Sequence, residues 1–259
     1  MRLHYEQFGT GPDLVLLHGW GLHGGVFSAL AERLAARYRV TLIDLPGHGR
    51  SPAQEQPQNL AALAAIVAAV APPRAAWVGW SLGGMIAAHL ALSAPARVDK
   101  LILVASSPRF ITGTDWPCAM DPTVLAGFAQ ALQEDYRGTL ERFLSLQVVP
   151  NAAEGWGTLR HLREMLFQFP SPAPQALRDG LAILRSIDLR TQLSALLCPT
   201  LFILGERDRL VPAAIAPTLK ALFPAVLVEV VKGAGHAPFL SHQQEFLTAL
   251  AAFLEKEHD

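Results

Sequence analysis

The feature that most constrains the fold is a repeated alternation of short apolar runs with longer segments of helical periodicity. The runs are rich in leucine and β-branched residues and lie at residues 14–18, 40–44, 77–80, 101–106, 200–205 and 226–231. Segments between them, such as 26–38 and 84–95, place apolar residues three or four positions apart. Strands that are apolar on both faces and alternate with helices are typical of a mostly parallel sheet covered on both sides. The sequence therefore predicts an α/β fold.

This alternation stops between residues 110 and 189. The segment shows helical periodicity, several prolines and no convincing strand, and the strand pattern resumes at Thr200. Insertions at the ends of strands commonly cover a substrate site. We therefore predict an α/β core formed by residues 1–109 and 190–259, with a helical lid inserted at residues 110–189.

Composition narrows the functional class. Hydrophobic residues make up 51% of the chain and charged residues 17%, which predicts a folded core. The apolar stretch at 60–71 is much shorter than the roughly 20 residues that span a bilayer. The first residues are polar where a signal peptide would be apolar, so a cytoplasmic protein is expected. A net charge of -1 gives no global attraction to nucleic acid or anionic membrane, so we expect a substrate that is small or presented by a small partner. A monomer is expected.

Neither a disulfide framework nor a metal site is expected. The two cysteines, Cys118 and Cys198, are too few for either, and the histidines lack ligand spacing. No cofactor is predicted.

The stretch WVGWSLGGMI at residues 77–86 contains the pattern G-x-S-x-G. The pattern alone is weak evidence, but here an apolar strand precedes it and a helical segment follows it. Small residues at Gly79, Gly83 and Gly84 would allow the sharp turn that presents a nucleophile between strand and helix. The context predicts that Ser81 is a nucleophile.

A serine hydroxyl at neutral pH needs a base, and the base needs an acid that orients it. Asp208, in LFILGERDRLVP, and His236, in VVKGAGHAPFLSH, each follow a predicted strand. Each residue by itself would more often be an ordinary loop residue. Together they complete the order Ser, Asp, His that is typical of α/β hydrolases, which predicts the catalytic triad Ser81, Asp208 and His236.

The oxyanion that forms on attack needs fixed N–H donors. We predict the backbone N–H groups of Leu82, directly after the nucleophile, and of Trp20, in the HGWG stretch that follows an early strand. The indoles of Trp20 and Trp80 are expected to line an apolar acyl pocket, with simple core packing as the alternative.

Two other functions compete with this interpretation. Residues 19–24 form a G-x-G-x-x-G pattern after a strand, and Asp44 ends the next strand, which is the arrangement of a dinucleotide-binding site. That alternative leaves the Ser81, Asp208 and His236 set unexplained. A hydrolase-like protein that binds ligands without catalysis would have no need of a complete triad.

The motifs HGWG, DLPGHGRS, GWSLGG, GERDRLVP and GHAPF occur in order, and the chain resembles the α/β-hydrolase superfamily. The stretches VASSP, DPTVLAGF, ERFLSLQ and HAPFLSH extend a finer resemblance to the BioH family of pimeloyl-[acyl-carrier protein] methyl ester esterases over nearly the whole chain. The resemblance implies a cofactor-free carboxylesterase of biotin biosynthesis that hydrolyses the methyl ester of pimeloyl-acyl carrier protein and releases methanol.

The resemblance also implies which residues meet the substrate. The implied substrate-binding residues are Trp20, Ser81, Leu82, Phe143, Leu144, Ser145, Leu146, Gln147 and His236. Three lid arginines would dock the acidic carrier protein: Arg137, Arg142 and Arg160. A general short-chain carboxylesterase or thioesterase stays open as an alternative, because neither fold nor triad determines the leaving group.

Overall fold

A seven-stranded sheet forms the centre of the protein. The computed structural model describes residues 2–149 and 153–256. The strand order is β1-β3-β2-β4-β5-β6-β7, with β1 antiparallel to β3 and the other neighbours parallel. The strands are β1 (Tyr5–Phe8), β2 (Asp13–Leu17), β3 (Arg39–Ile43), β4 (Ala75–Trp80), β5 (Val98–Val104), β6 (Thr200–Gly205) and β7 (Leu227–Val231). The predicted α/β class is confirmed.

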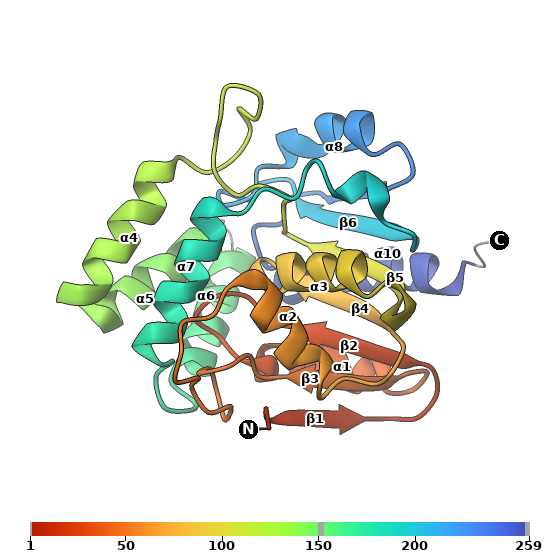
Figure 1. Ribbon diagram of the computed structural model, residues 1–259, viewed down its shortest axis with the longest axis horizontal. Coiled ribbons are helices and arrows are strands. Elements are labelled where there is room, and N and C mark those ends of the chain that lie inside the picture. Colours follow the sequence, from red (N-terminus) through yellow and green to blue (C-terminus); the bar gives the residue numbers. More distant parts are fainter. Residues whose placement is uncertain (1, 150–152, 257–259) are drawn as a thin grey trace.

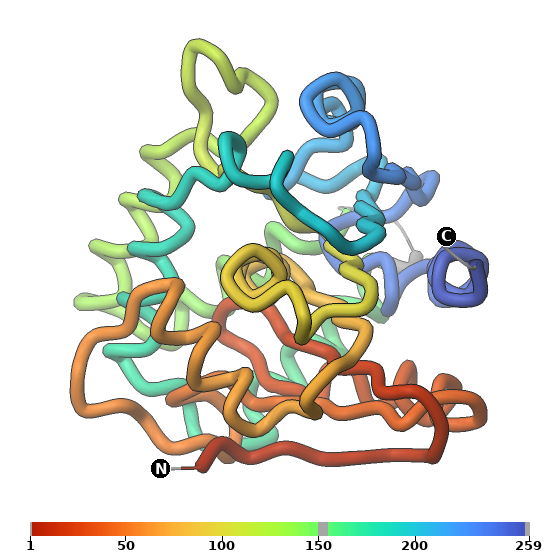
Figure 2. The backbone as a smooth tube through the Cα atoms, turned by 45° about the vertical axis from the view of Figure 1, so that its right-hand side comes forward, coloured from red at the N-terminus to blue at the C-terminus, as the bar shows by residue number. Residues whose placement is uncertain are grey.

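Helices cover both faces of this sheet. Helices α2 (Leu60–Ala68) and α3 (Leu82–Ser93) lie in front of it in Figure 1, whereas α1 (Ser28–Leu34) and α10 (Gln243–Glu255) lie behind. The inner strands β2 and β4 are consequently buried on both sides, which explains their continuous apolar sequences. Strand β1 and helix α8 (Ala216–Leu222), next to β7, lie at opposite edges of the molecule in Figures 1 and 2. The short helix α9 (Pro238–Ser241) precedes α10, and 3-10 turns lie at Gly24–Phe27, Pro95–Arg97, Leu193–Ala195 and Ala213–Ile215.

Among the described residues, four α-helices lie between β5 and β6, within the segment predicted to be a lid. They are α4 (Pro122–Glu134), α5 (Tyr136–Leu146), α6 (Ala153–Leu166) and α7 (Pro174–Ser186). Figure 1 shows them beyond the ends toward which the parallel strands point. We refer to residues 110–189 as the lid segment; its boundaries, and its status as a separate unit, stay a prediction.

Local sequence determines where the lid helices begin. Asp121 accepts a hydrogen bond from the Thr123 N–H at 2.8 Å and precedes Pro122, which suits the first turn of α4. Asp135 likewise accepts from the Gly138 N–H at 2.9 Å at the start of α5. Such side-chain caps satisfy N–H groups that a helix cannot pair internally, so α4 and α5 are separate helices although they adjoin.

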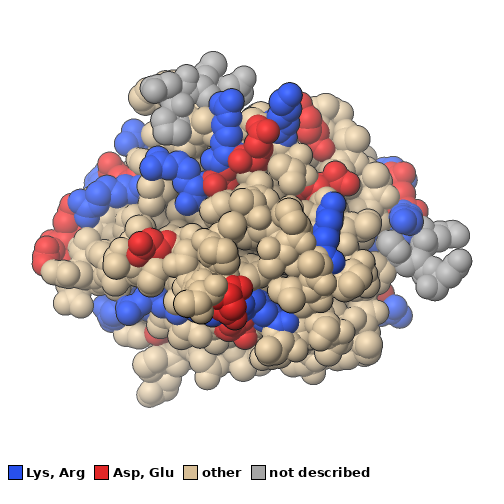
Figure 3. Space-filling view, turned by 90° about the horizontal axis from the view of Figure 1, so that it is seen from above, with Lys and Arg blue, Asp and Glu red and all other residues tan. Residues whose placement is uncertain are grey.

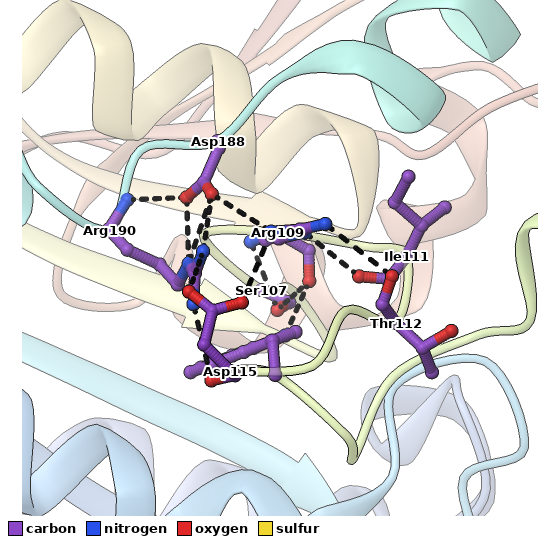
Figure 4. A network of polar contacts seen from close by, with 8 residues as sticks. Ser107, Arg109, Ile111, Thr112, Asp115, Asp188 and Arg190 are labelled. Atoms are coloured by element: carbon purple, nitrogen blue, oxygen red, sulfur yellow. Dashed lines mark hydrogen bonds and ion pairs between the residues drawn. The ribbon is translucent and has the colours of Figure 1, made fainter.

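The two connections between the lid segment and the sheet are tied to each other. The Leu189 N–H donates to the Pro108 carbonyl at 2.9 Å, and Arg109 forms an isolated bridge with Asp188. Figure 4 shows the Asp188 carboxylate between two guanidinium groups, at 3.4 Å from Arg109 and 2.7 Å from Arg190. Hydrogen bonds from Arg190 lower the pKa of Asp188, so the network is ionised at neutral pH. We call residues 108–109 and 188–190 the neck.

Candidate active site

Ser81 lies on a sharp turn between β4 and α3. Its backbone has a φ of 55° and a ψ of -118°, a conformation that residues with a side chain rarely adopt and that costs about 1–3 kcal/mol. The Ser81 N–H donates to the Val104 carbonyl at 2.9 Å. A side chain at Gly79 would come within 2.5 Å of the Gly83 carbonyl oxygen, and one at Gly83 within 2.4 Å of the Leu17 oxygen. The glycines around the serine are therefore required for the helix to pack this closely on the strands.

Asp208 and His236 follow β6 and β7 and form a buried pair. The His236 Nδ1–H donates to Asp208 Oδ2 at 2.7 Å. The other oxygen, Oδ1, accepts from the N–H groups of Leu210 at 2.8 Å and Val211 at 3.0 Å. With the Asp208 carboxylate as the acceptor of this bond, the imidazole proton is held on Nδ1.

The remaining ring nitrogen of His236 has its lone pair available. Nε2 is buried and has no hydrogen-bond partner within residues 2–149 and 153–256. The His236 backbone is held on two sides, since its N–H donates to the Gln147 carbonyl at 2.9 Å and its carbonyl accepts from Trp80 Nε1 at 2.7 Å. Trp80 precedes Ser81, so the histidine loop is tied directly to the turn that carries Ser81. The structure thus brings the three predicted triad residues to one edge of the sheet.

The HGWG stretch forms a rigid loop against the serine. A side chain on Gly19 would lie 3.2 Å from Ser81 Cβ, which shows how closely the loop approaches. The His18 Nδ1–H donates to the Gly19 carbonyl at 2.8 Å, and Nε2 accepts from the Leu45 N–H at 2.9 Å. Burial lowers the pKa of His18 to about 3, so its ring stays neutral and keeps both bonds. The loop that carries Trp20 is therefore fixed before substrate arrives.

The two tryptophans that flank the site differ in surroundings. The Trp20 indole packs edge-on against Phe143, with ring centroids 4.6 Å apart, and its Nε1–H donates to the Leu177 carbonyl of α7 at 2.9 Å. Trp80 instead packs among aromatic side chains of the core, with Phe239 at 5.1 Å and Phe27 at 6.4 Å. These contacts are those of the core-packing alternative, and Trp80 also supports the histidine loop. Its part in lining an acyl pocket stays a prediction.

The predicted substrate-binding stretch at the end of α5 presents two faces. Phe143, Leu144 and Gln147 are buried, with Phe143 against Trp20 and the Gln147 carbonyl on His236. Leu146 is half-buried. Ser145 is exposed and its hydroxyl donates to the Glu141 carbonyl at 3.0 Å. The helix turns Phe143 and Gln147 toward the site and Ser145 toward solvent.

The lid segment contributes to the burial of the predicted triad residues. Ser81 is 3% exposed and His236 1% exposed. A side chain at Gly180 of α7 would lie 2.6 Å from Trp20 Cδ1 and 3.1 Å from Leu82 Cδ2, so α7 rests directly on both predicted oxyanion residues. The packing of α7 on the HGWG loop and on Leu82 thus contributes to the burial of this part of the molecule.

His48 is a buried histidine near the site that takes no part in the triad. Its ring lies 5.3 Å from that of His18, and its Nδ1–H donates to the Pro46 carbonyl at 3.0 Å. Burial lowers the pKa of His48 to about 4. Nε2 is buried and has no partner in the part of the chain that the structure describes. The ring lines a small cavity beside Leu82, between the core and α7.

The predicted carrier-docking arginines are exposed, and each has an acidic neighbour. Arg137 lies 3.5 Å from Glu141 and stacks on the Phe167 ring at 4.2 Å. Arg142 lies 3.8 Å from Asp135, and Arg160 lies 3.9 Å from Glu164. On the face shown in Figure 3, positive and negative side chains are interspersed. Exposed pairs of this kind are weak, so these guanidinium groups can exchange partners at little cost.

Asp44, which would bind a ribose in the dinucleotide alternative, is bonded to other groups of the protein. It is 1% exposed, and its carboxylate accepts from the N–H groups of Gly24 at 2.7 Å and Arg50 at 2.9 Å. The glycine pattern at residues 19–24 is therefore the loop that packs on Ser81, with its end held by Asp44.

Comparisons with known proteins agree with this geometry. Residues 12–243 match the alpha/beta hydrolase fold family. A pimeloyl-[acyl-carrier protein] methyl ester esterase of Xanthomonas oryzae pv. oryzae is 48% identical over 97% of this chain and 98% of its own. One from Aeromonas hydrophila subsp. hydrophila is 46% identical over 98% and 100%, respectively. An esterase structure from Exiguobacterium antarcticum superposes with a TM-score of 0.87 at 23% identity, covering 98% of this chain and 96% of the other.

No helix within residues 2–149 and 153–256 is both long and apolar enough to cross a bilayer.

The fold, the strained serine turn and full-length similarity lead to one assignment. The chain belongs to the α/β-hydrolase fold family and, within it, to the pimeloyl-[acyl-carrier protein] methyl ester esterases.

Proposed function

We propose that the protein is a serine carboxylesterase that hydrolyses the methyl ester of pimeloyl-acyl carrier protein to the free acid and methanol. The observation that carries the chemistry is the buried Asp208–His236 pair, whose Nε2 lone pair is available beside the Ser81 turn. The proposed substrate is taken from the names of relatives that are 44–48% identical to this chain.

In the first half of the reaction, Ser81 Oγ attacks the ester carbonyl while His236 Nε2 takes its proton. Asp208 stabilises the imidazolium that forms. The N–H groups of Leu82 and Trp20 would hold the oxyanion of the tetrahedral intermediate. Collapse breaks the bond to methanol, which leaves with the proton from His236.

In the second half, His236 takes a proton from water as the water attacks the acyl-enzyme. Collapse of the second intermediate returns the proton to Ser81 and releases the acid. The buried surroundings formed by Leu82, Phe143 and Trp20 suit the methylene chain of a pimeloyl group, because they are apolar and closed to water.

The acyl carrier protein is the proposed partner. Exposed guanidinium groups of Arg137, Arg142 and Arg160 could exchange their acidic neighbours for carboxylates of the carrier. A general short-chain carboxylesterase with the same triad is the competing function, since the catalytic groups contact the ester and not the carrier.

Replacement of the nucleophile tests the chemistry. We expect Ser81→Ala to lower kcat on p-nitrophenyl acetate by about 10⁴-fold or more, because the covalent step is lost. Ser93→Ala is the matched control: Ser93 lies on the same helix, and its hydroxyl only donates to the His89 carbonyl at 2.8 Å. Near-normal turnover by a folded Ser81→Ala protein would refute the mechanism.

Substrate choice is tested separately. We expect kcat/KM to be higher for pimeloyl-carrier protein methyl ester than for free dimethyl pimelate, and to fall toward the value for the free diester when Arg137 and Arg142 are both changed to glutamate. Equal kcat/KM values for the two esters would favour the general esterase while leaving the triad intact.

A further inference from the structure

Ser106 is a buried serine outside the triad that contacts the nucleophile's own backbone. It follows β5 in the chain and is 1% exposed. Its hydroxyl donates to the carbonyl oxygen of Ser81 at 2.8 Å. The chain approaches this point through a second strained residue, Ala105, whose φ is 43° and whose N–H donates to the Ile203 carbonyl at 2.8 Å. Two neighbouring strands thus end in left-handed turns joined by one side-chain hydrogen bond.

The bonded carbonyl belongs to the same peptide unit as the Leu82 N–H. In a planar trans peptide the C=O and N–H groups point in opposite directions, so a bond that fixes one fixes the other. Leu82 is the first residue of α3, and its N–H has no acceptor within the helix. The Ser106 hydroxyl is therefore one of the contacts that fix the direction in which the predicted oxyanion donor points.

Other contacts on the Ser81 carbonyl come from α3 itself. The Gly84 N–H donates to it at 2.9 Å and the Met85 N–H approaches at 3.4 Å. These bonds move with the first turn of the helix, whereas Ser106 is attached to the sheet. Gly84 leaves room for this contact, because a side chain at this position would lie 2.4 Å from Ser106 Oγ.

We propose that Ser106 is a positioning residue of the oxyanion hole: by donating to the Ser81 carbonyl, it holds the Ser81–Leu82 peptide so that the Leu82 N–H points at the developing oxyanion. Donation to the carbonyl also polarises the peptide, which makes the Leu82 N–H a stronger donor. The inference rests on the proposed roles of Ser81 and Leu82, and it does not depend on which acyl group is the substrate.

The test compares Ser106→Ala with Ser107→Ala. Both remove one hydroxyl that bonds a backbone carbonyl, because Ser107 Oγ donates to the Arg109 carbonyl at 2.6 Å in the neck. Similar losses of thermal stability are therefore expected. The assay uses p-nitrophenyl acetate, and kcat is expressed per active site titrated with a fluorophosphonate, so unfolded protein does not contribute.

We expect Ser106→Ala to lower kcat about tenfold with little change in KM. Removal of a whole oxyanion donor costs about 10²- to 10³-fold, and here the donor is misdirected but retained. Affinity for a trifluoromethyl ketone, which forms a tetrahedral oxyanion on Ser81, should weaken by the same factor as kcat/KM. Affinity for the product acid should not change, and Ser107→Ala should match the wild type in all three measurements.

A purely structural serine would give a different pattern. If Ser106→Ala lowers the melting temperature but keeps wild-type kcat and trifluoromethyl ketone affinity, the inference is wrong. If Ser106→Ala does not fold, Ser106→Cys, with a similar shape and a weaker donor, replaces it and should show a smaller loss in the same two quantities. Failure of the proposed function is distinguishable, because Ser81→Ala would then retain turnover.

Discussion

The core and the lid segment hold the same site by different kinds of contact. On the core side, strand ends, a strained turn and side-chain bonds fix Ser81 and Asp208 within one continuous network. On the lid side, backbone carbonyls of Gln147 and Leu177 accept from His236 and Trp20, and Gly180 sits closely on the indole. The core thus holds the predicted triad residues by its own bonds, whereas the lid segment adds backbone carbonyls that hold His236 and Trp20.

This difference separates two kinds of mutational effect. Changes in the core network should remove chemistry while substrate still binds. Changes where the lid segment meets the core should alter how well the assembled site fits, and should act on kcat and KM together.

The largest effect is expected at the acid. Asp208→Asn should lower kcat by about 10⁴-fold, because an amide cannot hold the His236 tautomer that leaves Nε2 as the base. Measurement of kcat and KM on p-nitrophenyl acetate checks this, with circular dichroism to confirm the fold. A loss below tenfold would mean that the histidine is oriented by its backbone contacts to Gln147 and Trp80 without help from the carboxylate.

A smaller effect is expected where the lid segment meets the HGWG loop that carries Trp20. Gly180→Ala would place a methyl group 2.6 Å from Trp20 Cδ1, and we expect kcat/KM to fall about 10- to 100-fold because small displacements of catalytic groups are costly. Gly157→Ala in α6 is the matched control, since its added methyl meets nothing within 4 Å. It should retain activity and gain up to about 1 kcal/mol of stability. Equal activity of the two variants would show that the seating of α7 is irrelevant to turnover.

The smallest effect concerns stability alone. The folded-state pKa of His48, about 4, is below its ordinary value near 6.5, so the unfolded chain binds more protons between these values. The free energy of unfolding therefore decreases as pH falls through this window.

His48→Phe removes this contribution. Between pH 7 and pH 5, the free energy of unfolding should therefore fall by up to about 2 kcal/mol less in the variant than in the wild type. Urea unfolding at the two pH values measures the difference. Parallel losses in the two proteins would show that His48 does not take up a proton on unfolding in this range.

Much of the core could be predicted from the sequence because its determinants are local. Six parallel strands have continuous apolar runs, and the triad residues follow three of them. Strand β1 was not predicted, since YEQF is polar and only partly buried at a sheet edge. Ser106 lies in VASSP, one of the stretches that carry the family resemblance, but its contact with Ser81 depends on the pairing of β4 with β5.

The residues that the lid segment contributes to the site are harder to predict from the sequence, for a physical reason. Gln147 and Leu177 act through their carbonyls, and every residue has one, so no sequence pattern distinguishes them. The burial of Phe143 and exposure of Ser145 follow from the rotation of α5, which tertiary packing determines. The hydrogen bond of Trp80 likewise depends on the position of the histidine loop, which the sequence near Trp80 does not determine.

The neck has an architectural consequence. Because the chain enters and leaves the lid segment through a pair of connections that are bonded to each other, the segment is a loop closed at its base. An insertion or deletion between residues 109 and 188 changes the length of that loop. It does not change the separation of β5 and β6, because these strands are paired directly. We therefore expect insertions and deletions between the two sides of the neck to be tolerated better than changes in the strands that precede the predicted triad residues.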